Sequence, residues 1–200
     1  MKKSSHLILG GARSGKSRFA EANAQKIAAT HHYQLHYVAT ATAFDAEMQK
    51  RIAHHQALRQ QSNLLPWHEH ECPIQLTSLL STFTSQDVVL IDCLTLWLNN
   101  LIFELGSQPD EALLKQKIDR FVAAVEQCDA QLLLVANEVG LGIIPMGEVS
   151  RLFVDHAGWL NQKLAERVNR VTFIAAGLAM PLKNSMDNQP DKDEVNSAGL

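Results

Sequence analysis

Residues 6–17 read HLILGGARSGKS, a short apolar run followed directly by a glycine-rich turn and a Lys-Ser pair. The segment 10–17 fits the pattern G-x-x-x-x-G-K-[ST], and helical spacing continues in SRFAEANAQKIAA, residues 17–29. A strand, a glycine loop and a helix in this order favour a phosphate-binding loop over a chance glycine turn, because successive backbone N–H groups then surround phosphate oxygens at a helix N-terminus. The stretch therefore predicts an α/β fold that binds a nucleotide.

Each part of this loop has a predicted task. Glycine permits backbone conformations and close approaches that a side chain would forbid. Lys16 would reach the β- and γ-phosphates and take a catalytic part by neutralising their charge, while the hydroxyl of Ser17 would ligate Mg²⁺. The residues predicted to contact the nucleotide in this segment are Gly10, Gly11, Ala12, Arg13, Ser14, Gly15, Lys16 and Ser17.

Four more apolar runs follow the first, and none of them alternates with polar residues. Such runs, rich in Val, Ile and Leu, are typical of strands buried on both faces of a parallel sheet. Segments with helical spacing separate them, such as 111–127 and 150–168. The runs cover residues 36–40, 87–93, 131–137 and 170–177. The repeated order of strand and helix predicts a three-layer α/β sandwich around a mostly parallel sheet.

Composition limits the number of domains. The chain has 200 residues, of which 46% are hydrophobic and 20% are charged. This fits one globular domain with a sizeable core, which we assign to residues 1–183. Residues 184–200 are polar and almost free of large apolar side chains, so we expect them to form a mobile tail outside the packed domain.

Charge and cysteine content narrow the class of protein. The net charge is −3 and no run of Lys or Arg occurs, so we expect no nucleic acid and no anionic membrane surface as the main partner. The apolar segment near the start, MKKSSHLILGG, is too short for a signal peptide or a membrane span, which predicts a cytoplasmic protein. Three cysteines without CxxC spacing indicate reduced, apolar residues rather than disulfides or a zinc site.

Two carboxylates follow apolar runs. Asp92 ends VVLID in the position of a Walker B carboxylate, and we assign it to Mg²⁺, directly or through water. The alternative is an N-cap for a helix that begins near Leu94. Glu138 follows the fourth strand and would face the nucleotide or its acceptor, because parallel sheets bind ligands at the carboxyl ends of their strands. A solvated loop carboxylate is equally open for Glu138.

The segment RIAHHQALR, residues 51–59, carries two adjacent histidines. Thr42 and Asp45 form a capping-box signature, so a helix is expected from about residue 43. His55 falls on the apolar stripe of that helix, whereas His54 is turned about 100° away, toward the side of Arg51. For His54 the roles of metal ligand, general base, nucleophile toward phosphorus and solvated surface residue all stay open, with metal binding the weakest of them.

Several blocks, taken together in order, resemble the bifunctional adenosylcobinamide kinase / adenosylcobinamide-phosphate guanylyltransferase family of cobalamin biosynthesis. The blocks are ILGGARSGKSRFAE; YVATA followed by D-x-EM-x-x-RI-x-HH-x-x-x-R; W-x-x-x-E-x-P; LIDCLTLWLNNL; and NEVGLGIIP leading to SRLFVDHAGWLNQKLA. The likeness runs from about residue 6 to Lys183. It departs from the family pattern in AAGLAMPLK, where the family has a turn containing glycine and isoleucine.

The resemblance implies a RecA-like P-loop NTPase fold, a homotrimer and two reactions. ATP or GTP would phosphorylate adenosylcobinamide, and GMP from GTP would then pass through a covalent bond to His54 onto adenosylcobinamide phosphate. Mg²⁺ would be the cofactor. Further nucleotide contacts are implied for Ala39, Thr40, Ala41, His55, Gln56, Ala57, Leu58, Glu71 and Asp92. Supporting residues are Arg51, Arg59 and Glu138.

Three rival functions compete with this one. A monofunctional P-loop kinase for a small molecule would leave both histidines structural. A GTPase switch would carry an N-K-x-D motif, which does not occur in the sequence. A DNA-dependent RecA-like motor would carry a basic stripe, and the acidic balance counts against it.

Overall fold

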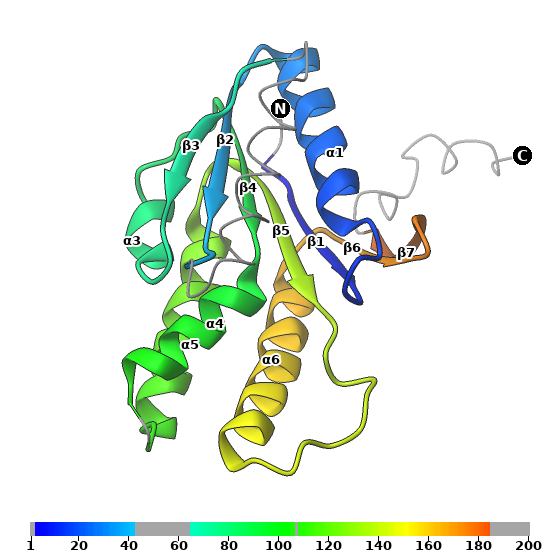
Figure 1. Cartoon of the computed structure of the whole chain (residues 1–200). Coiled ribbons are helices and arrows are strands. Elements are labelled where there is room, and N and C mark those ends of the chain that lie inside the picture. The colour runs from blue at the N-terminus through cyan, green and yellow to red at the C-terminus, as the bar shows by residue number, and fades with distance from the viewer. Residues whose placement is uncertain (1–2, 43–64, 107, 185–200) are drawn as a thin grey trace, which may run out of the picture.

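The computed structural model describes residues 3–42, 65–106 and 108–184. Seven strands in these ranges form one sheet in the order β3-β2-β4-β5-β1-β6-β7 (Figure 1). The first six strands are parallel to one another, and β7 runs antiparallel to β6. Their bounds are β1 Ser5–Gly10, β2 Gln34–Ala39, β3 His68–Glu71, β4 Asp87–Asp92, β5 Gln131–Asn137, β6 Arg170–Ala175 and β7 Leu178–Asn184.

Helices cover both faces of this sheet. Helix α1 packs on one face, and the other described helices pack on the opposite face (Figure 1). They are α1 Lys16–His31, α3 Leu76–Leu80, α4 Leu94–Glu104, α5 Glu111–Gln127 and α6 Glu148–Arg167. None of these described helices has both the length and the apolar character that a bilayer span requires. The predicted three-layer α/β sandwich with a mostly parallel sheet is confirmed.

Two apolar cores hold the layers together. On the side of α1, small residues spaced one helical turn apart, Ala20, Ala24 and Ala28, are fully buried and let the helix lie close to the strands. On the other side, Trp97 of α4 packs against Phe121 of α5 with ring centroids 4.5 Å apart. Each large side chain buried in this way contributes roughly 1.5–3 kcal/mol to folding. The cysteines 72, 93 and 128 are free and buried in the cores, as predicted.

The sequence patterns predicted the inner strands and missed the two at the edges of the sheet. Strand β3 reads HEHE, so it offers no apolar run to detect. Strand β7 follows β6 through a two-residue turn in which Ala176 and Gly177 have φ angles of 50° and 79°. Positive φ at both positions suits a tight hairpin. Strand β7 continues to Asn184, the first residue assigned to the tail, and residues 185–200 lie outside the described ranges.

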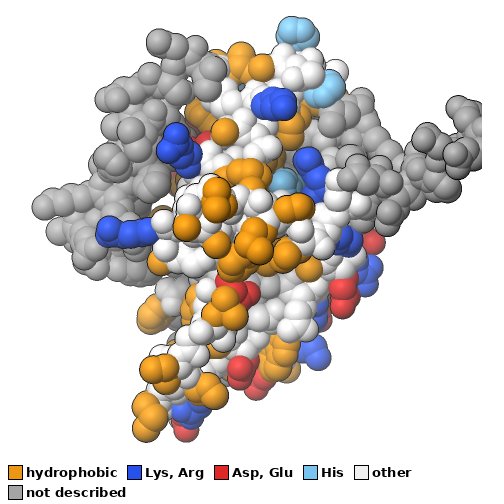
Figure 2. Space-filling view, turned by 90° about the vertical axis from the view of Figure 1, so that its right-hand side faces the viewer, with side chains coloured by type: hydrophobic (Ala, Val, Ile, Leu, Met, Phe, Trp, Pro, Cys, Tyr) orange, Lys and Arg blue, Asp and Glu red, His pale blue; other side chains and the backbone are white. Residues whose placement is uncertain are grey.

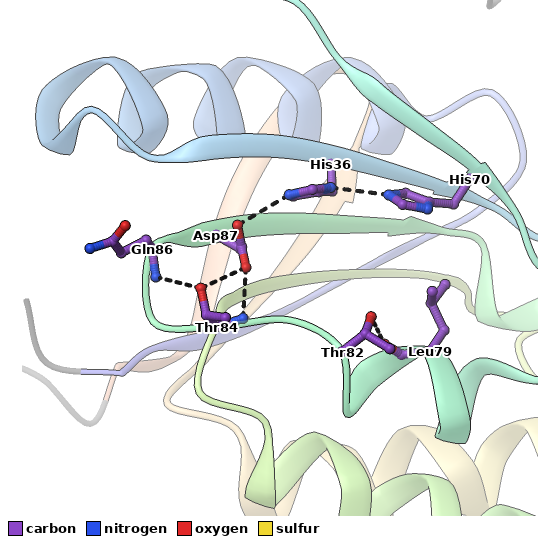
Figure 3. A network of polar contacts seen from close by, with 7 residues as sticks. All are labelled: His36, His70, Leu79, Thr82, Thr84, Gln86 and Asp87. Atoms are coloured by element: carbon purple, nitrogen blue, oxygen red, sulfur yellow. Dashed lines mark hydrogen bonds and ion pairs between the residues drawn. The ribbon is translucent and has the colours of Figure 1, made fainter.

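Polar contacts attach the edge strand β3 to the rest of the sheet (Figure 3). His36 of β2 lies between His70 of β3, at 3.0 Å, and the carboxylate of Asp87, at 3.2 Å. The same carboxylate accepts hydrogen bonds from the backbone N–H and the hydroxyl of Thr84. Burial, and then the neighbouring His36 and His68, lower the pKa of His70. The histidine contacts therefore replace, at this edge, the apolar packing found at the centre.

A further histidine is buried in β1. The Nε2 atom of His6 lies 2.8 Å from the hydroxyl of Thr172, and the residue is 4% exposed. Burial, and then the charge of Arg170, lower the pKa of His6 to about 4. In the unfolded chain the pKa of histidine is near 6.5. Between that pH and about 4, this histidine therefore binds a proton in the unfolded state and not in the folded state.

We predict that the contribution of His6 to the free energy of unfolding is fully present above about pH 6.5. This contribution, up to about 3 kcal/mol, is lost as the pH drops toward 4. Urea unfolding at several pH values measures it. His6→Gln should flatten this slope, whereas the same change at the exposed His31 should leave it as in the wild type. A slope unchanged in His6→Gln would contradict the assignment.

Candidate functional site

The parallel register brings the predicted site residues together at the carboxyl ends of the strands. Ala39, the last residue of β2, pairs with Glu71 of β3 on one side and with Asp92 of β4 on the other. Gly10, the last residue of β1, pairs with Asn137 of β5. All of these residues end their strands. Because the strands are parallel, the loops that follow them open on the same side, where α/β sheets bind ligands.

The glycine loop leaves this end of the sheet through a narrow passage. A Cβ atom added to Gly10 would lie 2.3 Å from the carbonyl oxygen of Ile174, so no other residue fits there without moving β6. Gly15 has a φ of 99° and is the N-cap residue of α1. The carbonyl of Ser14 accepts a hydrogen bond from the N–H of Gly177 at 2.9 Å. The loop is thus held against β6 and the turn that follows it.

Lys16 is folded back into the loop. Its side chain is buried, and Nζ donates a hydrogen bond to the carbonyl of Gly11 at 2.6 Å. Burial lowers the pKa of the lysine, while Cys93 and Asp92 partly oppose this shift. The ammonium group therefore lies against the backbone of the loop, and its contact with the β- and γ-phosphates stays a prediction.

Asp92 and Ser17 are the residues predicted to hold Mg²⁺. Asp92 is half-buried at the end of β4, and its carboxylate accepts a hydrogen bond from the hydroxyl of Tyr37 at 3.3 Å. It does not cap α4, since the N-cap residue is Cys93 and makes no side-chain cap. The alternative of a helix cap is therefore wrong. Carboxylate and hydroxyl oxygens suit Mg²⁺, which keeps several waters and takes other ligands from phosphates.

A larger set of metal ligands does not occur in the described ranges. No group of three or more His, Cys, Asp or Glu side chains there could hold a metal ion. A site with one carboxylate and one hydroxyl, completed by a nucleotide and water, is typical of Mg²⁺ in phosphate-transferring proteins. The residues present therefore fit the ion that the sequence implies.

Buried polar groups tie the ends of β2, β3 and β4 together. The fully buried hydroxyl of Thr40 donates to the carbonyl of Cys93 at 2.7 Å and accepts from its N–H at 2.9 Å. The side-chain amide of Asn100 donates to the carbonyls of Thr40, at 2.8 Å, and Pro73, at 3.1 Å. The backbone beside Ala41 and Glu71 is fixed in this way. Asn100 was missed from the sequence, although an amide on the apolar side of a helix was a usable signal.

Glu138 lies beside the start of the glycine loop. Its N–H donates to the carbonyl of Gly10 at 3.0 Å, and its carboxylate accepts from the N–H of Gly140 at 2.8 Å. The side chain is half-buried and closes a turn. The expectation that Glu138 faces the nucleotide or its acceptor, rather than solvent, stays a prediction.

Part of the predicted site falls on residues 43–64. The expected helix from about residue 43 lies outside the described ranges. So do the histidines and their neighbours, namely Arg51, His54, His55, Gln56, Ala57, Leu58 and Arg59.

A family model described as "Cobinamide kinase / cobinamide phosphate guanyltransferase" matches residues 6–182, which include the glycine loop and every described strand end except that of β7. The chain belongs to this family. Family members are bifunctional enzymes, with one kinase and one guanylyltransferase activity. The family resemblance stated from the sequence is thereby confirmed.

Relatives of known name share most of the length of the chain. "Bifunctional adenosylcobalamin biosynthesis protein CobP" of Pseudomonas aeruginosa is 47% identical over 182 residues, which cover 88% of this chain and 96% of the relative. "Bifunctional adenosylcobalamin biosynthesis protein CobU" of Salmonella typhimurium is 36% identical over 187 residues, covering 88% and 98%. The likeness therefore spans nearly the whole of both relatives.

Solved structures of distant sequence share the fold. The flagellar accessory protein FlaH from Methanocaldococcus jannaschii has a TM-score of 0.55 at 14% identity, covering 94% of this chain and 81% of FlaH. A second solved structure, of an ATPase domain, has a TM-score of 0.52 at 11% identity, covering 94% of this chain and 78% of that domain. These likenesses concern the fold alone, and they confirm a P-loop NTPase fold of RecA-like type.

We predict that Asn100→Ala lowers the free energy of unfolding by about 2 kcal/mol, because it leaves buried carbonyls without donors. The affinity for GTP should fall several-fold as the ends of β2 and β3 loosen. Thermal unfolding and equilibrium binding measure the two effects. Asn99→Ala, the same change one position earlier on α4, is the control and should alter neither. Wild-type values in Asn100→Ala would show that the amide ties nothing together.

Proposed function

We propose that this protein phosphorylates the aminopropanol hydroxyl of adenosylcobinamide with ATP or GTP, and then transfers GMP from GTP to the product. The final products would be adenosylcobinamide-GDP and pyrophosphate. The observation that carries the proposal is the family match over residues 6–182, and it is supported by a glycine loop whose lysine is buried against the loop backbone. The names of the relatives in Pseudomonas and Salmonella, which place them in adenosylcobalamin biosynthesis, support it.

In the kinase step, the chain's main task is to position charge. Backbone N–H groups of the glycine loop and the ammonium of Lys16 would surround the phosphates. Ser17 and Asp92 would hold Mg²⁺, which when bound would neutralise charge on the phosphate oxygens. Transfer of the γ-phosphoryl group to an alcohol needs little covalent help from protein, so orientation and electrostatics supply most of the rate.

In the guanylyl step, a histidine would carry the nucleotide. A neutral nitrogen of His54 would attack the α-phosphorus of GTP, forming a P–N bond while the bond to pyrophosphate breaks. A phosphate oxygen of adenosylcobinamide phosphate would then attack the same phosphorus, and the P–N bond would break to restore the histidine. His54 lies outside the described residues, so this step is supported by the HH motif and the family match alone.

The remaining implications of the resemblance are part of the same proposal. We expect a homotrimer, a cytoplasmic location and no nucleic-acid partner. The net charge of −3 supports the last point, because nucleic-acid binding is usually carried by a basic surface. A monofunctional kinase is the alternative that the following experiment separates.

We predict that the purified protein, incubated with Mg²⁺ and GTP labelled at the α-phosphate and then denatured, retains the label. A histidine phosphoramidate should lose it in acid and keep it in base. His54→Ala should abolish the label and still phosphorylate the corrinoid, whereas Lys16→Met should lose both activities because the phosphates are no longer neutralised. His31→Ala, at an exposed position, is the control. Absence of label in a protein that binds GTP would leave the monofunctional kinase.

A further inference from the structure

The segment between β5 and α6 exposes an unusual number of apolar side chains. We call residues 138–147 the apolar loop. Within it Leu141, Ile143, Ile144 and Met146 are 80%, 98%, 78% and 94% exposed. In Figure 1 the loop follows β5 and runs along the lower end of the molecule. Figure 2 shows hydrophobic side chains open to solvent on the face turned to the viewer, including its lower end. Soluble proteins rarely group such residues at the surface unless a ligand or partner covers them.

Hydrogen bonds hold this loop in shape at both ends. At its start, the carboxylate of Glu138 accepts from the N–H of Gly140. At its end, the guanidinium of Arg151 donates to the carbonyls of Pro145, at 3.2 Å, and Met146, at 2.5 Å. The polar backbone is thus partly occupied internally while the apolar side chains point outward. A surface arranged beforehand loses less entropy when it binds.

The loop begins at the phosphate loop. The N–H of Glu138 donates to the carbonyl of Gly10, the first residue of the glycine-rich segment, at 3.0 Å. A chain spans at most roughly 3.5 Å per residue, so Ile144 lies within about 20 Å of this contact. A single molecule with a large apolar body and a long side arm could therefore touch both loops.

We propose that the apolar loop is the platform on which the corrin macrocycle of cobinamide rests while its alcohol arm reaches the phosphate loop. This inference rests on the proposed function. The macrocycle has carbon-rich faces bearing methyl groups and a rim of amides, so its faces match Ile143, Ile144 and Met146, and its rim stays in water. Methionine adapts well to irregular apolar shapes. The triphosphate of a nucleotide gains nothing from these side chains, so we assign the loop to the acceptor.

The test is equilibrium dialysis of cobinamide against the full chain that carries Ile143→Ser and Ile144→Ser, with cobinamide measured by its visible absorption. The dissociation constant of cobinamide should rise about tenfold or more, because two large apolar contacts are lost. GTP binding and the sedimentation coefficient should match the wild type. Leu178→Ser with Met180→Ser is the matched control, since these residues of β7 are also exposed and apolar but lie outside the loop. It should leave cobinamide binding unchanged.

The other outcomes overturn the inference in distinct ways. Wild-type cobinamide affinity in the loop variant would show that the macrocycle rests elsewhere, with the proposed function intact. A parallel loss of GTP affinity would mean that the loop supports the phosphate loop instead. A change in sedimentation would mean that a second copy of the chain covers these residues. Failure of the wild-type protein to bind or phosphorylate cobinamide would refute the proposed function itself.

Discussion

The parallel pairing of six strands is the constraint on which the rest of the molecule depends. Parallel neighbours cannot be joined by tight turns, because the chain must return from the end of one strand to the end of the sheet where the next strand begins. In this chain the parallel pairing brings the carboxyl ends of β1, β2, β3, β4 and β5 to one end of the sheet. The residues that precede the loops, such as Gly10, Ala39 and Asp92, meet there although they are far apart in sequence.

Polar contacts, rather than apolar packing, give this end of the sheet its final shape. Apolar residues such as Leu90 and Val135 fill the centre of the sheet, and their burial favours compactness without specifying exact positions. Hydrogen bonds are directional, and buried ones are costly to break. Thr40 and Asn100 therefore fix strand ends that hydrophobic contacts alone would leave free to shift. Apolar packing therefore stabilises the domain, and the directional hydrogen bonds fix the strand ends that the site residues occupy.

The sequence predicted the features that local pattern determines. Apolar runs located the inner strands, and α5 occupies the expected residues 111–127, because burial on both faces and helical periodicity leave strong signals. Strands β3 and β7 left none, since one is polar and both lie at an edge. Asn100 was missed because its importance comes from partners distant in sequence. The role assigned to His54 came from resemblance, as spacing alone kept several roles open.

The bond between Lys16 and Gly11 has a consequence for selectivity. The carbonyl takes one of the three N–H donors of the ammonium and leaves two, while it holds the charge inside the loop. A neutral ligand oxygen that meets these donors replaces water with a hydrogen bond of similar strength and gains little. A charged phosphate oxygen forms a shorter and stronger bond, so its exchange with water is favourable. A lysine held in this position therefore favours polyphosphates over neutral ligands.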